Sequence, residues 1–296
     1  MNLTAVLLTV VFFIYIASVL TNITLLLLIY FNISLHKPMY IFLFCLLVNG
    51  LIGSTAIWPK VMVILLTGVN TATYGGCLAQ VFLAVSYGAC NYTMFTVMAY
   101  DRLVSIFQPL QYHSVMTPRK VRELLLAAEV VPVVCVLVQV WLTSRMTLCG
   151  KNIHRIHCDN LSVTALSCGN SPHINQVTNL YGICLILGFL VVPVVLVLLS
   201  YAKIILFVLK SPKKTRRKAF ETCSPHVIVF INFSFASLFS VVYNRVSSYL
   251  PREANVFLSV NYILFPPLLH PVIYGMKNQE IRQCLSKMSK RAVRII

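Results

Sequence analysis

The sequence predicts an all-α membrane protein: a seven-transmembrane helix bundle with a short amphipathic helix after the last span. Hydrophobic residues make up 58% of the 296 residues and charged residues only 10%, with a mean hydropathy of +0.84, which is too apolar for a water-soluble domain. Seven apolar stretches are each long enough to cross a hydrocarbon core, which takes about 20 helical residues. These stretches lack the strict alternation of barrel strands, so helices are expected.

The first three spans are predicted at 3–30, 39–67 and 75–107. The first lacks a basic leader and is longer than the apolar core of a signal peptide, so we expect it to remain as a span. The second follows Lys37, and the third is uncharged as far as Tyr100. Short connections join these spans.

The remaining spans are predicted at 121–142, 177–209, 220–248 and 255–276. The first of these follows a basic cluster, and the next comes after the only long connection in the chain. The sixth span follows a run of lysine and arginine, and the seventh ends just before Lys277. An odd number of spans places the two termini on opposite sides of the membrane.

A short amphipathic helix is predicted at 278–289. Ile281, Leu285 and Met288 recur at i, i+4 and i+7, which is the spacing of one helix face. Basic residues surround this face, so we expect the helix to lie on the membrane surface. The whole chain, 1–296, is expected to form a single domain.

The basic residues predict the orientation of the bundle. Most of the 24 Lys and Arg flank one side of the predicted spans, and the positive-inside rule makes that side cytoplasmic. We therefore expect a multi-pass protein of the plasma membrane with its amino terminus outside. The formal charge of +17 indicates attraction to membrane lipid rather than binding of nucleic acid.

Acidic residues are too few for most kinds of intramembrane chemistry. The chain has seven, and only Glu129 lies near the middle of a span. This leaves no carboxylate pair, proton relay or metal cage in the membrane, which argues against an enzyme and an ion-coupled pump. We expect no cofactor and no metal site. A transporter or channel is the weaker alternative, because it would need a continuous polar lining that the sequence does not provide.

Asp101-Arg102 is the most informative feature, because it ends the uncharged part of the third span. Two charges at a membrane boundary are costly to bury unpaired, so such a pair more often acts as a latch than as a packing element.

Five sequence blocks occur in the order of a known family. They are Leu35 to Tyr40, Met98 to Arg102 with Pro109-Leu110, Ser200-Tyr201, Lys218 to His226, and Pro266-Pro267 with Pro271 to Tyr274. Together they resemble the signature of rhodopsin-like G-protein-coupled receptors in its olfactory form. The Lys-Ala-Phe-x-Thr-Cys-x-x-His block, joined to Met-Ala-Tyr-Asp-Arg, is close to diagnostic of odorant receptors.

This resemblance implies an odorant receptor that activates the stimulatory olfactory G protein, raises cyclic AMP and resides in sensory-neuron cilia. Asp101 would hold Arg102 until activation releases the arginine to the G protein. Tyr201, His226 and Tyr274 would complete the switch. A rhodopsin-like receptor for a ligand other than an odorant is the alternative.

Four cysteines on the outer side indicate two disulfides, and their spacing leaves the pairing open. The resemblance implies Cys77 with Cys158, which leaves Cys149 with Cys168; the pairing of Cys77 with Cys168 is the alternative. The long outer connection also holds a candidate glycosylation site at Asn160.

Two positions depart from the family pattern. Asn49-Gly50 stands where most members carry an acid, and His270-Pro271 stands where the family has Asn-Pro. We therefore expect the acid-centred sodium site to be weak or absent. His270 is expected to be a neutral, packed histidine; the alternatives are that it replaces the missing amide or makes the switch sensitive to pH.

The ligand hypothesis starts from the absence of any acid between residues 75 and 100, which disfavours an amine ligand. Arg245 lies 27 residues beyond Lys218, or about 40 Å along a helix, at the far mouth of the bundle. An arginine there can hold a carboxylate in a fork, so a small, water-soluble anionic odorant is the hypothesis. The alternative, given equal weight, is that the arginine side chain extends to the membrane surface and binds no ligand. The other expected lining residues are Ala84, Val85, Gly88, Ser237, Val241 and Tyr262.

Overall fold

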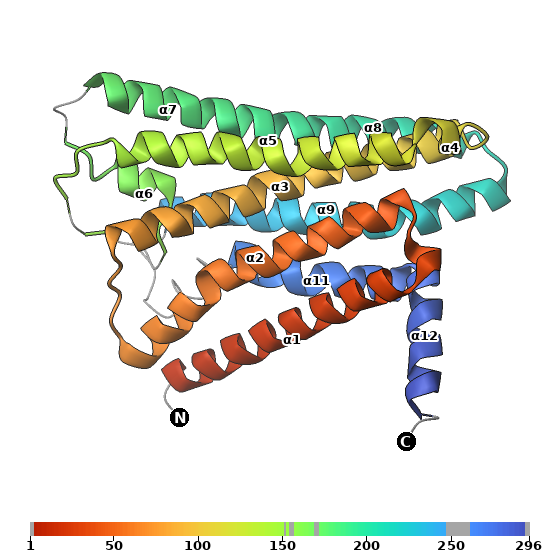
Figure 1. Cartoon of the computed structure of the whole chain (residues 1–296), viewed down its shortest axis with the longest axis horizontal. Coiled ribbons are helices and arrows are strands. Elements are labelled where there is room, and N and C mark those ends of the chain that lie inside the picture. Colours follow the sequence, from red (N-terminus) through yellow and green to blue (C-terminus); the bar gives the residue numbers. More distant parts are fainter. Residues whose placement is uncertain (1–2, 151, 154–156, 169–171, 247–260, 294–296) are drawn as a thin grey trace.

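Long helices lying side by side form the bundle shown in Figure 1. The computed structural model describes residues 3–150, 152–153, 157–168, 172–246 and 261–293. Within these residues it contains helices and one isolated β-bridge, between Leu148 and Ser167. The predicted class, an all-α membrane bundle, is confirmed.

The described part of the chain contains six helices that are long and apolar enough to cross a membrane. They are α1 (Leu3–Phe31), α2 (Pro38–Thr67), α3 (Tyr74–Phe107), α5 (Pro118–Ser144), the continuous run of α7 (Pro172–Ile186), η2 (Leu187–Val191) and α8 (Val192–Leu209), and α9 (Lys213–Val246). The described part of the seventh predicted span is α11 (Asn261–Lys277). The short elements are η1 (Ile33–Leu35), α4 (Tyr112–Val115), α6 (Asn160–Thr164) and α12 (Gln279–Val293).

Several helices extend beyond the predicted spans. The sixth was expected at 220–248, but α9 begins at Lys213; the fourth and fifth begin at Pro118 and Pro172 rather than at 121 and 177. Hydropathy marks where a helix enters hydrocarbon, not where it begins. Lysine and arginine are good helix formers, so α9 continues into the basic run.

Local sequence explains where helices begin and end. The Thr73 hydroxyl accepts a hydrogen bond from the Gly76 N–H at the start of α3, and Thr117 caps the Lys120 N–H in the same way, with Pro118 at the first position of α5. At the end of α2, Gly68 takes a left-handed conformation with φ of +70°.

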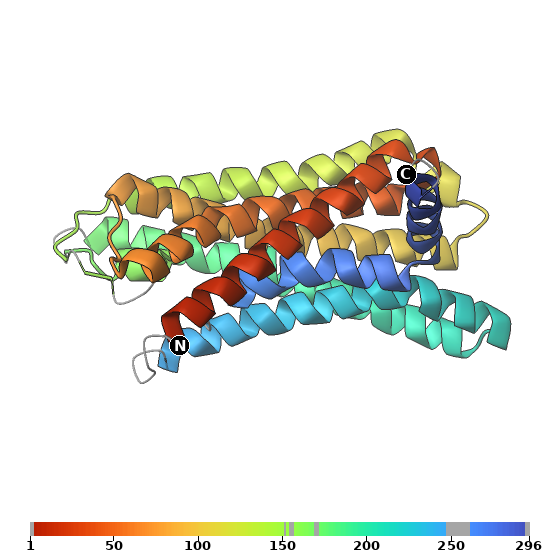
Figure 2. The same ribbon diagram turned by 90° about the horizontal axis from the view of Figure 1, so that it is seen from below.

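The two ends of the bundle differ, as Figures 1 and 2 show. One end, called here the α6 end, carries α6 and the start of α1. The other, called here the α12 end, carries α4 and α12, which lies across the bundle. There Lys37 forms an ion pair with Glu280 at 2.7 Å, Tyr40 donates to the Asn278 amide oxygen at 3.1 Å, and Ile281 is fully buried.

Candidate functional site

The charged pair Asp101-Arg102 lies on α3 near the α12 end of the bundle. The Asp101 carboxylate is fully buried and accepts two hydrogen bonds from Arg102, one of them from Nε at 2.9 Å. The Tyr112 hydroxyl of α4 donates to the other carboxylate oxygen at 2.6 Å. Burial raises the pKa of Tyr112, and the charge of Asp101 raises that pKa further, so Tyr112 remains a donor at neutral pH. The structure thus holds Arg102 against a satisfied counter-charge.

A second contact joins α8 to α9 at the same end of the bundle. The Tyr201 hydroxyl hydrogen-bonds Nδ1 of His226, and the two rings stack with centroids 5.4 Å apart. Both residues are buried, and the edge of Phe95 from α3 packs on His226 at 5.7 Å. This contact ties α8 to α9, the helix that begins before its predicted span at this end of the bundle.

Tyr274 of α11 completes the cluster. Its side chain is fully buried near Arg102. Its hydroxyl has no hydrogen-bond partner among the described residues. The five residues expected to form the switch therefore gather at one end of the bundle, although they come from α3, α8, α9 and α11.

His270 lies one helical turn from Tyr274 in a ring-lined part of the core. Its ring packs against Phe95 at 6.0 Å and Phe233 at 6.1 Å between centroids. Its Nε2 atom has no hydrogen-bond partner in the described part of the chain. This placement is that of a packed histidine rather than of a replacement for the missing amide.

Asn22 supplies a polar link that the sequence did not indicate. Pro271 has no N–H, so the Pro267 carbonyl one turn earlier loses its helical donor. The Asn22 amide of α1 donates to this carbonyl at 2.6 Å. A Cβ added to Gly50 would lie 3.5 Å from the Pro267 Cβ and 3.6 Å from the Asn22 amide oxygen. An acid at position 50 would thus adjoin this link, and glycine leaves the link without a charge.

Glu129 of α5 is the second residue whose role the sequence missed. Its carboxylate accepts a hydrogen bond from the Asn49 amide of α2 at 2.8 Å, and its backbone carbonyl accepts a weak one from the Cys90 thiol of α3 at 3.8 Å. Glu129 thus gives Asn49 an acidic partner, whereas Gly50 beside the Asn22–Pro267 link stays without one. The sequence did offer one signal for this role, because Glu129 is the only acid near the middle of a predicted span.

Replacing Glu129 with leucine is expected to destabilise the bundle. The Asn49 amide would lose its acceptor, and an unpaired buried donor costs about 1–3 kcal/mol. Thermal inactivation of the purified protein should shift to lower temperature by several degrees. Glu129→Gln is the matched control, because it keeps an acceptor oxygen and should lose much less. Equal thermal stability of the leucine variant and the wild type would contradict the assigned contact.

The expected ligand residues fall into three groups. Ala84 packs against the main core, whereas its neighbour Val85 packs against a smaller cluster around Cys77 and Cys158 at the α6 end. Gly88 and Ser237 are buried, and Ser237 donates to its own helix. The side chains of Val241, Arg245 and Tyr262 lie outside the described residues.

Two disulfides hold the connection between α5 and α7 in the structure. Cys77 at the start of α3 pairs with Cys158, and Cys149 pairs with Cys168. Asn160, the candidate glycosylation site, is the first residue of α6 and accepts a hydrogen bond from Thr143 at 2.9 Å. Among the described residues no group of three or more His, Cys, Asp or Glu is placed to hold a metal ion.

The chain is similar in sequence to known olfactory receptors. The family model described as olfactory receptor matches residues 11–291. The chain is 31% identical to human olfactory receptor 52K1, over 94% of this chain and 88% of that protein. It is 33% identical to human olfactory receptor 10J1, over 92% of this chain and 84% of that protein, and 33% identical to mouse olfactory receptor 5T7, over 93% and 87%.

Proposed function

Because this chain belongs to the olfactory receptor family and is therefore an odorant-sensing G-protein-coupled receptor rather than an enzyme, we propose that it activates the stimulatory olfactory G protein and raises cyclic AMP. The multi-pass chain would act in the plasma membrane of sensory-neuron cilia. Its partners are a small odorant, the G protein and membrane lipid.

The latch at the α12 end is the observation that carries this proposal. Asp101 holds Arg102, while Tyr201 and His226 tie α8 to α9 beside it. Moving α9 away from α8 breaks the tyrosine–histidine contact and opens the bundle next to Arg102. A freed guanidinium then has five N–H donors to offer to carbonyl groups of a partner helix.

Charge supports a cytoplasmic location for this end. The basic run from Lys213 to Lys218 lies at the start of α9, and Lys210 ends α8. By the positive-inside rule these residues remain on the cytoplasmic side. Antibody access to an amino-terminal epitope tag in unpermeabilised cells tests the orientation; access only after permeabilisation would contradict it.

The proposed ligand is a small anionic odorant bound toward the α6 end. The α9 helix is continuous from Lys213 to Val246, so the backbone of Arg245 lies at the opposite end of α9 from the basic run. An arginine at the mouth of an apolar bundle can bind a carboxylate through two parallel hydrogen bonds. Ala84, Gly88 and Ser237 are proposed to line the apolar part of this site, with Val85, Val241 and Tyr262 near its mouth.

Replacing Arg245 with alanine is expected to weaken the response to short-chain carboxylic acids. Hydrogen bonds to a charged group contribute about 1.5–3 kcal/mol, so the half-maximal concentration should rise about 10-fold to 100-fold. The measurement is a cyclic-AMP dose–response in cells with matched surface expression. Lys60→Ala removes another charge from the α6 side and should leave the dose–response unchanged. A full acid response by the Arg245 variant would end the ligand proposal.

A further inference from the structure

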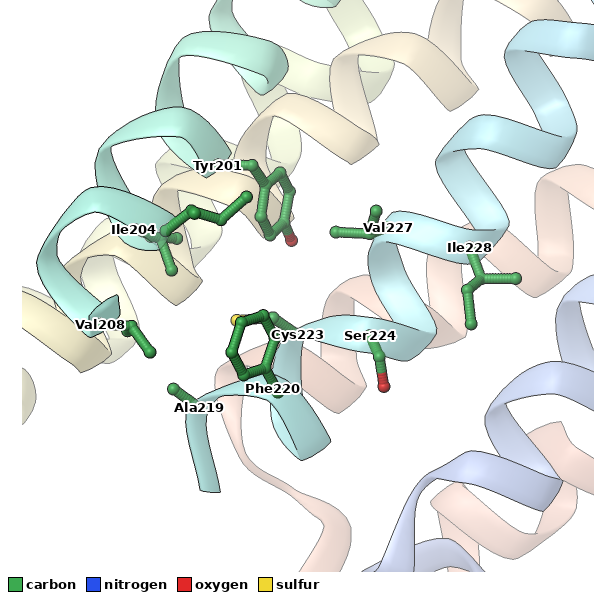
Figure 3. Close-up of a pocket in the computed structure, with 10 residues that line it drawn as sticks. Tyr201, Ile204, Val208, Ala219, Phe220, Cys223, Ser224, Val227 and Ile228 are labelled. Carbon is green, nitrogen blue, oxygen red and sulfur yellow. The ribbon is translucent and has the colours of Figure 1, made fainter. Parts of the chain in front are cut away.

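An apolar groove separates α8 from α9 near the α12 end, and Figure 3 shows its lining. Tyr201, Ile204 and Val208 project from α8 toward Cys223 and Val227 of α9. The cavity between them has a volume of about 180 Å³.

The groove has a buried floor and an exposed rim. Ile204, Val208 and Cys223 are buried, whereas Phe220 and Ile228 are 48% and 39% exposed. In a membrane these exposed side chains face the acyl chains of lipid. The groove is therefore open to a hydrocarbon chain entering from the side.

Two basic residues continue the groove face of α9 toward its beginning. Arg216 precedes Phe220 by four residues, and Lys213 precedes Arg216 by three, so all three lie on one side of the helix. Arg216 is half-buried and Lys213 is exposed. Neither forms an ion pair with another described residue, whereas Arg217 is occupied by Glu221 at 2.8 Å.

We propose that this groove is a binding site for an anionic phospholipid, with one acyl chain between α8 and α9 and the phosphate held by Lys213 and Arg216. The apolar lining and the basic mouth match the two parts of such a lipid. A zwitterionic phospholipid carries the same phosphate together with a cation that the two basic residues repel, so it should bind more weakly. A small apolar molecule would use only the cavity. The lipid belongs to the cytoplasmic leaflet if the proposed orientation holds; binding itself can be measured without it.

The charge test uses the full chain, purified in detergent and titrated with phosphatidylserine while bound lipid is counted by native mass spectrometry. The Lys213→Gln/Arg216→Gln variant should bind about 30-fold more weakly, which corresponds to about 1 kcal/mol for each charge. The control, Lys214→Gln/Lys218→Gln, removes the same charge from the opposite face of α9 and should bind like the wild type. Equal loss in both variants would overturn the site, because binding would then follow net charge alone.

A second experiment tests the acyl-chain part of the site by filling the groove without changing its charge. Figure 3 shows Val227 pointing toward α8, so Val227→Phe should occupy the space and lower phosphatidylserine binding by at least several-fold. Leu206→Phe is the control, since Leu206 is 64% exposed and does not line the groove. Phosphatidylcholine with the same chains should bind more weakly, and glycerophosphoserine, which lacks chains, should not compete. Equal binding of the two lipids, or unchanged binding by Val227→Phe, would overturn the proposal, whatever the outcome of the cyclic-AMP assays.

Discussion

Replacing Asp101 with asparagine is expected to raise ligand-independent cyclic-AMP production about 10-fold to 100-fold. The carboxylate is fully buried and holds Arg102 through charge-assisted hydrogen bonds, each worth about 1.5–3 kcal/mol. Asparagine keeps the shape but loses the charge. The balance between held and released Arg102 therefore shifts toward release by one such interaction.

The measurement is basal cyclic AMP divided by receptor density at the cell surface, which separates activation from loss of folded protein. Tyr112→Phe is the matched control, because it removes one neutral donor from the same carboxylate. Its basal signal should rise only a few-fold. A normal surface level of the asparagine variant with unchanged basal signal would mean that Asp101 does not hold the receptor inactive.

Replacing Cys77 with serine is expected to remove most of the receptor from the cell surface. The Cys77–Cys158 disulfide joins residues 81 positions apart and fixes the start of α3 to the connection between α5 and α7. Losing a native disulfide typically costs about 2–5 kcal/mol, which is a large part of the stability of a folded domain. Flow cytometry of a tagged chain measures the loss.

Double replacements test which cysteines are paired. With Cys77 joined to Cys158, the Cys77→Ser/Cys158→Ser variant should be no worse than either single variant, because both break the same bond. The Cys149–Cys168 bond spans only 19 positions, so its loss should cost about 1 kcal/mol less. If Cys77→Ser/Cys168→Ser instead matches its single variants, the pairing is the alternative one.

Much of the helical architecture could be predicted from the sequence, because each span carries its own signal. Apolar length marks the spans. Helix boundaries near charged residues were harder to predict. Lys213 begins α9, although hydropathy placed the span at 220, because a helix can continue past the membrane without any change in its backbone hydrogen bonds.

Only part of the candidate switch and its surroundings could be predicted from the sequence. Asp101-Arg102 stands out because two charges interrupt an apolar run, and its neighbours identify the family. Nothing local links Asn49 to Glu129, which lies 80 residues away, or Asn22 to the Pro267 carbonyl, which lies 245 residues away. Each of these groups is costly to bury unpaired, so a partner was required, but its identity depended on how the helices pack.

By itself, the sequence determined a membrane bundle, its family and the charged pair Asp101-Arg102, because hydropathy and short motifs are local properties of the chain. Only the tertiary structure decided that Glu129 accepts a hydrogen bond from Asn49, that Asn22 satisfies the carbonyl freed by Pro271, and that an apolar groove separates α8 from α9. The physical reason is that hydrogen-bond partners and cavities arise between helices. Their rotation and spacing follow from the packing of all side chains together.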